Sequence, residues 1–278
     1  ILTGDPKTGK TTTALQIAAT CQKEGRPVIY LDAEGRLKAM NLGGVEGLDL
    51  SKMRVVHSDE EPLSAEKFLD IALKLVSSKE FERCVCIVDS TSSLIPEKEL
   101  TEDLSGSFRA GLPKILAVFC RKMGQIIPKQ KATMIIITHF IANTSGYGAS
   151  RLPDCGRKIQ YQADTRMEVK NIKSWESGSV QIGQQINWKI VCSSMGSPGT
   201  MCTSWLRYGK GLDGTQEMLQ IACEIGLISK AGAWYNCDFM GEDAKKFQGQ
   251  DKLHQFLKEN PDTLKELEKQ VKEMLCVQ

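Results

Sequence analysis

The chain has 278 residues, of which 41% are hydrophobic and 25% charged, so it is long enough for one large core and a small lobe. Its formal net charge is only +2, so no global field attracts nucleic acid, and such a site would have to be a local basic patch. The 10 cysteines form no CxxC pair that would indicate zinc, and no apolar stretch approaches membrane-spanning length. We therefore expect a cytoplasmic protein with no membrane partner. The chain begins without methionine, almost inside a strand, so we also expect N-terminal residues to be missing.

A glycine-rich octapeptide, GDPKTGKT, follows the apolar start of the chain and precedes a helical pattern. In a phosphate-binding loop, two glycines let the backbone wrap a phosphate, a lysine reaches its oxygens, and a hydroxyl serves Mg²⁺. Gly4, Gly9, Lys10 and Thr11 have these properties at the required spacing. The predicted nucleotide-binding residues are Gly4, Asp5, Pro6, Lys7, Thr8, Gly9, Lys10, Thr11 and Thr12.

Short apolar runs alternate with amphipathic stretches through the first half of the chain, which is typical of βαβ units and a mostly parallel sheet. We expect strands over residues 27–32, 53–57, 84–89, 133–138, 164–171, 181–192 and 203–208. We expect helices over residues 10–24, 64–77, 111–127 and 215–225. Two long polar segments, 97–107 and 141–157, each follow a predicted strand and are expected to be functional loops.

The composition changes near residue 226, after which the chain becomes polar and rich in helical patterns. Two short helices are expected over residues 251–259 and 261–275, separated by Asn260-Pro261. We therefore predict a large core over residues 1–222 and a small lobe over residues 223–278.

Acidic residues follow two of the predicted strands. Asp89 ends the apolar run at 86–88, and ligands of open α/β sheets bind beyond the carboxyl ends of the strands. Beside a phosphate loop, this position favours a role for Asp89 in the Mg²⁺ shell. Glu34 follows the strand that ends at Asp32 and could orient a water for attack on a γ-phosphate, with a helix-capping or surface role equally open.

His139 and three basic residues complete the candidate chemistry. His139 directly follows the strand at 133–138, where it could sense a γ-phosphate, although a histidine that merely caps a strand is the alternative. Arg109, Lys114 and Arg121 follow the first polar segment, and the last two share a helical face. They could contact DNA phosphates, with a solvated basic face as the alternative.

Together these stretches resemble the RecA family of bacterial and phage recombinases over nearly the whole chain. The most specific stretch is GLISKAGAWY at 226–235, which is followed by Asn260-Pro261 and a Lys/Glu-rich helix and is similar to the C-terminal lobe of bacterial members. Residues 30–34, 88–90 and 208–211 are similar to further family blocks. The resemblance implies an α/β fold, a RecA-like P-loop NTPase core with a mostly parallel central sheet and a small α+β C-terminal lobe.

The resemblance also implies an activity and its partners. A family member would be a DNA-dependent ATPase that uses ATP and Mg²⁺ and assembles with copies of itself into a helical filament on single-stranded DNA. That filament would pair with duplex DNA and exchange strands in recombination and repair, and in the SOS response to DNA damage it would meet a LexA-type repressor.

The site residues carried over from the family fall into three groups. The catalytic group would be Glu34, which activates the water, with Lys10 and His139. Thr11 and Asp89 would serve the metal, and Tyr208 would lie near the adenine. The DNA-binding residues would be Arg109, Lys114, Arg121, Asn143, Tyr147, Gly156 and Arg157.

Two departures from the bacterial pattern keep alternatives open. His139 stands where bacterial members carry glutamine, as in phage recombinases of the UvsX type, so a bacterial cell or a phage-infected host is expected. Cys192 and Ser194 stand where a bacterial lysine pair reaches the neighbouring subunit's ATP, and neither is charged. A filament-forming DNA-binding protein with weak ATPase activity is thus one alternative. A helicase or clock-type ATPase on the same core is another, against which the stretch at 231–235 argues.

Overall fold

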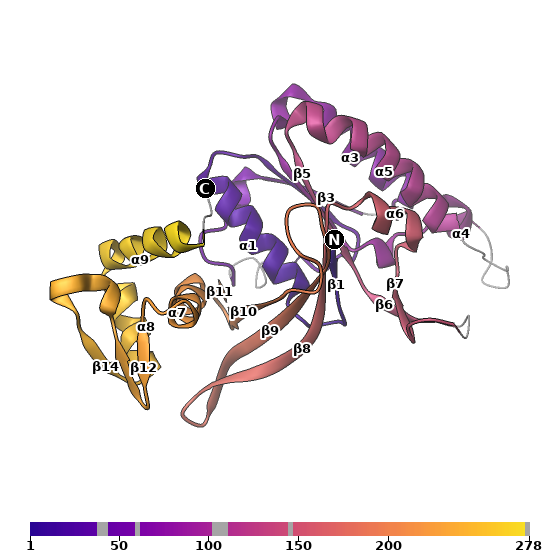
Figure 1. Cartoon of the computed structure of the whole chain (residues 1–278). Coiled ribbons are helices and arrows are strands. Elements are labelled where there is room, and N and C mark those ends of the chain that lie inside the picture. The colour runs from indigo at the N-terminus through magenta and orange to yellow at the C-terminus, as the bar shows by residue number, and fades with distance from the viewer. Residues whose placement is uncertain (38–43, 59–61, 102–110, 144–146, 276–278) are drawn as a thin grey trace. The chain divides into compact units, whose positions relative to one another are not determined.

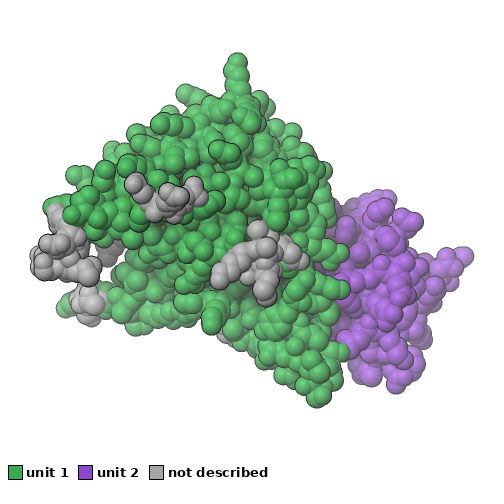
Figure 2. Space-filling view, turned by 180° about the vertical axis from the view of Figure 1, so that it is seen from behind, with its two compact units in different colours: residues 1–202, 206–212 green, residues 203–205, 213–278 purple. Residues whose placement is uncertain are grey.

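A computed structural model describes residues 1–37, 44–58, 62–101, 111–143 and 147–275 of the protein. The chain forms two compact units, one of residues 1–202 and 206–212 and the other of residues 203–205 and 213–278 (Figure 2). The boundary predicted between residues 222 and 223 falls inside helix α7 (Gly214–Glu224), which lies wholly in the second unit. Arg109 lies outside the described residues, as does the side chain of Arg157.

A nine-stranded sheet in the order β11-β10-β9-β8-β1-β5-β4-β2-β3 organises the first unit. Its central pairs, from β8 through β1, β5, β4 and β2 to β3, are parallel, and β8 pairs with β9 antiparallel. The sheet is therefore mixed and mostly parallel, as expected. Its strands are β1 (Leu2–Thr3), β2 (Val28–Asp32), β3 (Met53–His57), β4 (Val85–Asp89), β5 (Thr133–Thr138), β8 (Thr165–Ser177), β9 (Val180–Ser193), β10 (Met201–Arg207) and β11 (Gly211–Leu212).

Helices cover both faces of this sheet (Figure 1). Side chains alternate along a strand, so Ile29 and Leu31 of β2 pack with α3 and α5, while Val28 and Tyr30 pack with α1 on the opposite face. Every residue of β2 and β4 is buried, which is why both strands read as continuous apolar runs. In the part of this unit that the structure describes, the α-helices are α1 (Lys10–Lys23), α3 (Ala65–Ser77), α4 (Glu97–Thr101), α5 (Gly111–Gln130) and α6 (Gly156–Gln162).

The register of the sheet aligns the ends of its strands. Asp32 of β2 is paired with Asp89 of β4, and Thr3 of β1 with Thr138 of β5. The segments that follow β1, β2, β4 and β5 therefore leave from one edge of the sheet. That edge carries the phosphate loop, Glu34, Asp89 and His139.

The two polar segments expected to be loops are partly regular. Residues 97–101 form α4, while residues 102–107 lie outside the described part of the chain. In the second segment β6 (Phe140–Ala142) and β7 (Arg151–Pro153) form an antiparallel pair, and α6 begins at Gly156. Strands and helices this short leave no periodic pattern in the sequence, so the loop prediction was wrong for these parts.

The strand expected over 164–171 is longer than predicted. β8 continues to Ser177 and pairs with β9 as far as Val180, with irregular register at three places. The extension is mostly polar, so no hydrophobic alternation marks its end. The remaining differences at element boundaries are small, such as α5 continuing through Pro128 to Gln130.

The second unit is a small α+β lobe, as expected. Its antiparallel sheet contains β12 (Ser229–Ala231), β13 (Trp234–Asn236) and β14 (Lys246–Gln248), and it packs with α7, α8 (Gln250–Glu259) and α9 (Pro261–Met274). Leu219, Leu253, Leu257 and Leu267 fill its core.

Short 3₁₀ helices occur in both units. They are η1 (Leu50–Lys52), η2 (Lys79–Phe81) and η3 (Thr91–Ser93) in the first unit and η4 (Asp238–Asp243) in the second. In the described ranges no helix is long and apolar enough to cross a membrane.

Candidate functional site

The phosphate loop joins β1 to α1 and leaves the helix end open to an anion. Gly9 occupies the N-cap position with φ 86°, and within the described chain no side chain caps the helix and no acidic residue stands in its first turn. The first N–H groups of an α-helix have no partner within the helix and bind phosphate well. The positive φ of Gly9 would strain any L side chain, and a Cβ there would lie 2.5 Å from Ile186 Cδ1, so the turn favours glycine.

Lys10 lies under the loop and holds its backbone. Its Nζ donates to the carbonyl oxygens of Gly4 (2.9 Å) and Asp5 (2.7 Å), while Thr8 Oγ1 donates to the same Asp5 oxygen (2.8 Å). Only 4% of Lys10 is exposed, and burial lowers the pKa of its ammonium group to about 8. The buried cation is thus positioned by carbonyls at the point where a nucleotide phosphate would supply negative charge.

Thr11 and Asp89 form the candidate metal site. Thr11 Oγ1 donates to Asp89 Oδ2 (2.6 Å), and the hydroxyl of Tyr30 donates to the same oxygen (2.6 Å). Burial raises the pKa of the Asp89 carboxyl, although both hydrogen bonds act in the opposite direction. One hydroxyl and one carboxylate beside a phosphate loop fit Mg²⁺, which binds through few protein oxygens together with substrate phosphates. Within the described residues no group of three or more His, Cys, Asp or Glu side chains could hold a metal by itself.

Glu34 is surrounded by donors just beyond β2. Its Oε1 accepts hydrogen bonds from Ser90 Oγ (2.7 Å) and faces His139 Nε2 (2.9 Å), while Oε2 pairs with Arg36 (3.2 Å). Burial acts to raise the pKa of the carboxyl, but the contacts with His139, Ser90 and Arg36 together hold it below its ordinary value. Glu34 is therefore ionised at neutral pH, with both oxygens engaged.

His139 connects Glu34 to the phosphate loop. While its Nε2 faces Glu34, its Nδ1 lies 3.5 Å from Lys10 Nζ. The neutral tautomer that satisfies both contacts carries its proton on Nε2, which donates to the carboxylate and leaves the Nδ1 lone pair toward the ammonium group. Lys10, His139 and Glu34, predicted separately from the sequence, thus form one continuous series of contacts.

Tyr208 lies just after β10. It is half-exposed, and its hydroxyl accepts a hydrogen bond from Gln181 Nε2 (3.0 Å). Its expected place beside an adenine stays a prediction.

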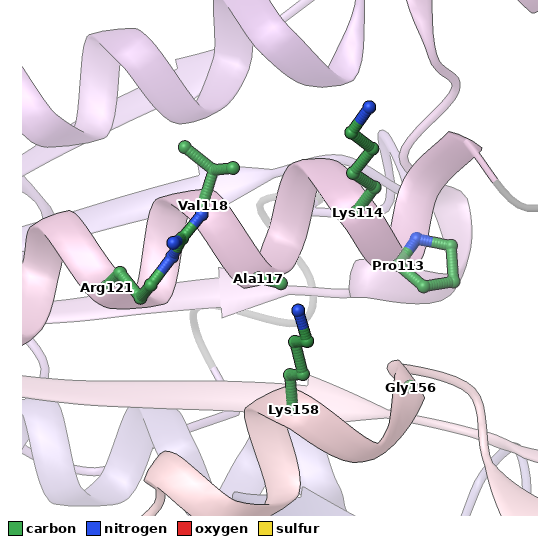
Figure 3. A pocket seen from close by; sticks show the side chains of 7 residues that line it. All are labelled: Pro113, Lys114, Ala117, Val118, Arg121, Gly156 and Lys158. Carbon is green, nitrogen blue, oxygen red and sulfur yellow. The ribbon is translucent and has the colours of Figure 1, made fainter.

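A basic pocket of about 420 Å³ lies between α5 and α6. Its lining includes Lys114 and Arg121 from α5 and Gly156 and Lys158 from α6, and Figure 3 shows Lys158 extending from α6 toward Ala117. A Cβ at Gly156, whose φ is 73°, would lie 3.1 Å from Pro113 Cβ, so this glycine permits the close approach of the two helices. The structure thus brings together Lys114, Arg121 and Gly156, three of the predicted DNA-binding residues.

Asn143 and Tyr147 lie at the far end of the β6–β7 pair. The Asn143 side chain donates to the carbonyl oxygens of Tyr147 (2.7 Å) and Ala149 (2.8 Å), so its amide is bound to the backbone of its own segment. The Tyr147 side chain is 90% exposed. Their contact with DNA stays a prediction, as does that of Arg109 and Arg157.

Several residues at the site were missed by the sequence analysis. Tyr30 precedes Asp32 by two positions on a buried strand, where a tyrosine normally indicates only core packing. Ser90 follows Asp89 directly, and its position at a strand end was an available signal. Arg151 lies in the polar segment that was interpreted as a loop, and Lys158 directly follows that segment; no local pattern indicates the partners of either residue.

Comparison with known proteins identifies the family. A family model described as the RecA N-terminal domain matches residues 2–213, and one described as the RecA C-terminal domain matches residues 216–276. The chain belongs to the RecA family. It is 31% identical to Protein RecA of Acholeplasma laidlawii over 270 residues, which are 97% of this chain and 78% of that protein. It is 32% identical to Protein RecA of Thermotoga neapolitana over 277 residues, covering 97% and 76% of the two chains.

Membership of this family establishes the general activity. The chain is a recombinase that binds DNA in an ATP-dependent way and hydrolyses ATP in response to DNA, in recombination and repair. Members of the family use ATP with Mg²⁺ and form filaments on DNA. The two domain matches do not favour the helicase, clock-type or weak-ATPase alternatives.

Proposed function

We propose that this chain performs ATP-gated binding of single-stranded DNA through the connected residues Lys10, His139 and Glu34. The observation that carries the proposal is the double contact of His139, whose two ring nitrogens face Lys10 at 3.5 Å and Glu34 at 2.9 Å. One imidazole can therefore respond both to the phosphate that Lys10 holds and to the state of the carboxylate. Loss of the γ-phosphate after hydrolysis would change its position and that of the β6–β7 segment, which begins at the next residue.

The nucleotide would bind over residues 4–12, with Lys10 exchanging carbonyl oxygens for phosphate oxygens and Tyr208 near the adenine. Thr11 would hold Mg²⁺ and Asp89 would order its shell, and the ion would neutralise charge on the transferred phosphoryl group. Tyr30 donates to Asp89 Oδ2 and so keeps that carboxylate oriented toward Thr11.

Glu34 would accept a proton from the attacking water at one of its carboxylate oxygens. In the structure, Oε1 accepts a hydrogen bond from Ser90 Oγ and contacts His139 Nε2, and Oε2 forms an ion pair with Arg36. Oε1, with two donors, has both of its acceptor positions filled, so one donor must leave before this oxygen can accept a proton from water. Rearrangement of His139 on nucleotide binding would open one position on Oε1 while Ser90 still donates to it, which makes hydrolysis at Oε1 conditional on a filled site.

The basic pocket would bind the phosphates of single-stranded DNA. Lys114 and Arg121 supply positive charge on one wall, and Gly156 lets α6 approach α5 closely. Asn143, Tyr147, Arg157 and Arg109 would extend this surface along the strand.

The proposed assembly, the further partners and the location follow from membership of the RecA family. Copies of the chain would assemble into a helical filament, pair single-stranded with duplex DNA, and meet a LexA-type repressor. The proposed location is the cytoplasm of a bacterium or of a phage-infected host.

Binding of a fluorescent single-stranded oligonucleotide, measured with ADP and with the slowly hydrolysed analogue ATPγS, tests the gate. The parent protein should bind DNA about tenfold or more tightly with ATPγS, and His139→Ala should lose most of that difference. Equal ATPγS dependence in His139→Ala would remove His139 from the gate.

A further inference from the structure

An acidic side chain in the phosphate loop is paired with the β6–β7 segment. Arg151 Nη1 donates to Asp5 Oδ2 (3.0 Å), and Arg151 Nη2 donates to Asp5 Oδ1. The guanidinium also lies over the Phe140 ring, 4.8 Å from its centre. A planar guanidinium with two parallel bonds to a carboxylate fixes orientation as well as distance, so one side chain joins the phosphate loop to both strands of the β6–β7 pair.

The position of Asp5 makes this pair sensitive to the nucleotide. A carboxylate in a loop that binds phosphates repels them unless a cation neutralises it. The Asp5 carbonyl accepts from both Lys10 Nζ and Thr8 Oγ1, so its backbone is held by the lysine that would turn to an incoming phosphate. Any change in these bonds alters the position of the Asp5 side chain, and with it Arg151.

The position of Arg151 makes the same pair sensitive to DNA. Arg151 is paired with Ala142 in the β6–β7 ladder, which starts one residue after His139. Downstream, β7 leads within a few residues to Gly156, which lines the basic pocket between α5 and α6. In Figure 1, β6 and β7 lie side by side as a projecting pair. A movement of this pair therefore has a short covalent route to the DNA-binding surface.

We infer that the Asp5–Arg151 ion pair is a positioning contact that couples nucleotide binding to DNA binding by linking the phosphate loop to the β6–β7 pair. The inference rests on the proposed function and adds a second connection beside His139. Asp5 and Arg151 are each about half exposed, at 50% and 49%, so the pair is open to solvent and weakens as salt rises.

The test is a double-mutant cycle on the full chain with Asp5→Asn, Arg151→Gln and the two combined. The coupling factor is the ratio of oligonucleotide dissociation constants measured with ADP and with ATPγS. Each single variant should lower this factor by about two- to fivefold, the effect expected of a half-exposed ion pair. The double variant should lower it no further than either single one, because the same contact is lost in all three.

A second measurement, the affinity for ATPγS, separates loss of coupling from a general loss of nucleotide binding. Arg151→Gln should weaken ATPγS binding because the Asp5 carboxylate remains unneutralised, and adding Asp5→Asn should restore that binding while the coupling factor stays low. Arg151→Lys should retain part of the coupling, since it keeps the charge and loses the paired geometry. Lys52→Gln, which removes a cation from the exposed Lys52–Asp49 pair (3.1 Å), is the matched control and should leave both readings unchanged.

Three results would overturn the inference. Single variants with the parent's coupling factor would show that the pair transmits nothing, while leaving ATP-gated DNA binding intact. Losses that multiply in the double variant would show that the two residues act independently. A parent protein that binds DNA equally with ADP and ATPγS would overturn the gating proposal and this inference together.

Discussion

His139 Nε2 lies 2.9 Å from Glu34 Oε1, although 105 positions separate the two residues in the chain. Each follows a different strand of the parallel sheet, and the register brings both strand ends to the same edge. Ser90 donates to the same carboxylate oxygen, so the proposed base is held by two donors before any ligand binds. If Glu34 Oε1 is the base, one of these donors must move before it can accept a proton, which would tie the chemistry to nucleotide binding.

Replacing Glu34 by glutamine should remove the proton acceptor. We expect Glu34→Gln to lower the rate of ATP hydrolysis by about 10²- to 10⁴-fold, while ATP still binds. Steady-state phosphate release and ATP binding by calorimetry measure the two effects. Glu24→Gln, an exposed glutamate at the end of α1, is the control. Hydrolysis by Glu34→Gln at the parent rate would exclude Glu34 as the base.

Asp89 should set the Mg²⁺ requirement. Asp89→Asn keeps the shape of the side chain but loses its charge, so the Mg²⁺ concentration for half-maximal hydrolysis should rise by about 10- to 100-fold. Tyr30→Phe removes one hydrogen bond to the same oxygen and should cause a smaller rise. An unchanged Mg²⁺ titration for Asp89→Asn would contradict the metal assignment.

The basic pocket should contribute to the salt dependence of DNA binding. Lys114→Ala, Arg121→Ala and Lys158→Ala should each weaken binding and reduce the slope of log affinity against log salt by about 1. Lys122→Ala is the matched control, because Lys122 is exposed on the same helix and is not part of the pocket lining. If Arg121→Ala behaves like Lys122→Ala, Arg121 does not contact DNA.

The second unit should lose stability in acid through Asp213. This carboxyl accepts from Gln216 N at the start of α7 and lies 2.9 Å from His254 Nε2 and 3.3 Å from Lys258 Nζ. Burial acts to raise its pKa, but His254, the Gln216 N–H and Lys258 hold it well below its ordinary value of 3.8. The folded state therefore gains stability from this group above pH 3.8 and loses it progressively as the pH falls further.

Asp213→Asn should isolate that contribution, because asparagine caps helices about as well as aspartate. At pH 7 the free energy of unfolding should fall by about 1–3 kcal/mol, and its decline in acid should become shallower. Urea unfolding of the full chain from pH 3 to 7 measures both. Asp262→Asn, whose side chain is 99% exposed, should follow the parent curve.

Most of the candidate nucleotide site could be predicted from the sequence because its chemistry is local. The phosphate loop is contiguous, and Asp89 and His139 each end an apolar strand, so motif and strand order together placed them at one edge. The Asp5–Arg151 pair joins residues 146 positions apart, and its geometry depends on a three-residue strand that leaves no pattern. Tyr30 was missed for a different reason, since its hydroxyl contact with Asp89 is indistinguishable in sequence from ordinary core packing.

The basic pocket was only partly predictable. The spacing of Lys114 and Arg121 indicated a shared helical face, but the approach of α6 depends on the backbone at Gly156 and on packing against Pro113. Lys158 joins the surface only because of that packing. Contacts between separate elements depend on the tertiary fold. Short polar segments have no hydrophobic periodicity from which such contacts could be predicted.

The rate of ATP hydrolysis by the parent protein with and without single-stranded DNA, with duplex DNA as the control, tests the central claim most directly. If nucleotide binding moves His139 and DNA bound at the adjoining β6–β7 segment keeps it away from Glu34, hydrolysis should be slow alone, strongly stimulated by single strands and less stimulated by duplex. Hydrolysis that is equally fast with and without single-stranded DNA would contradict that gate.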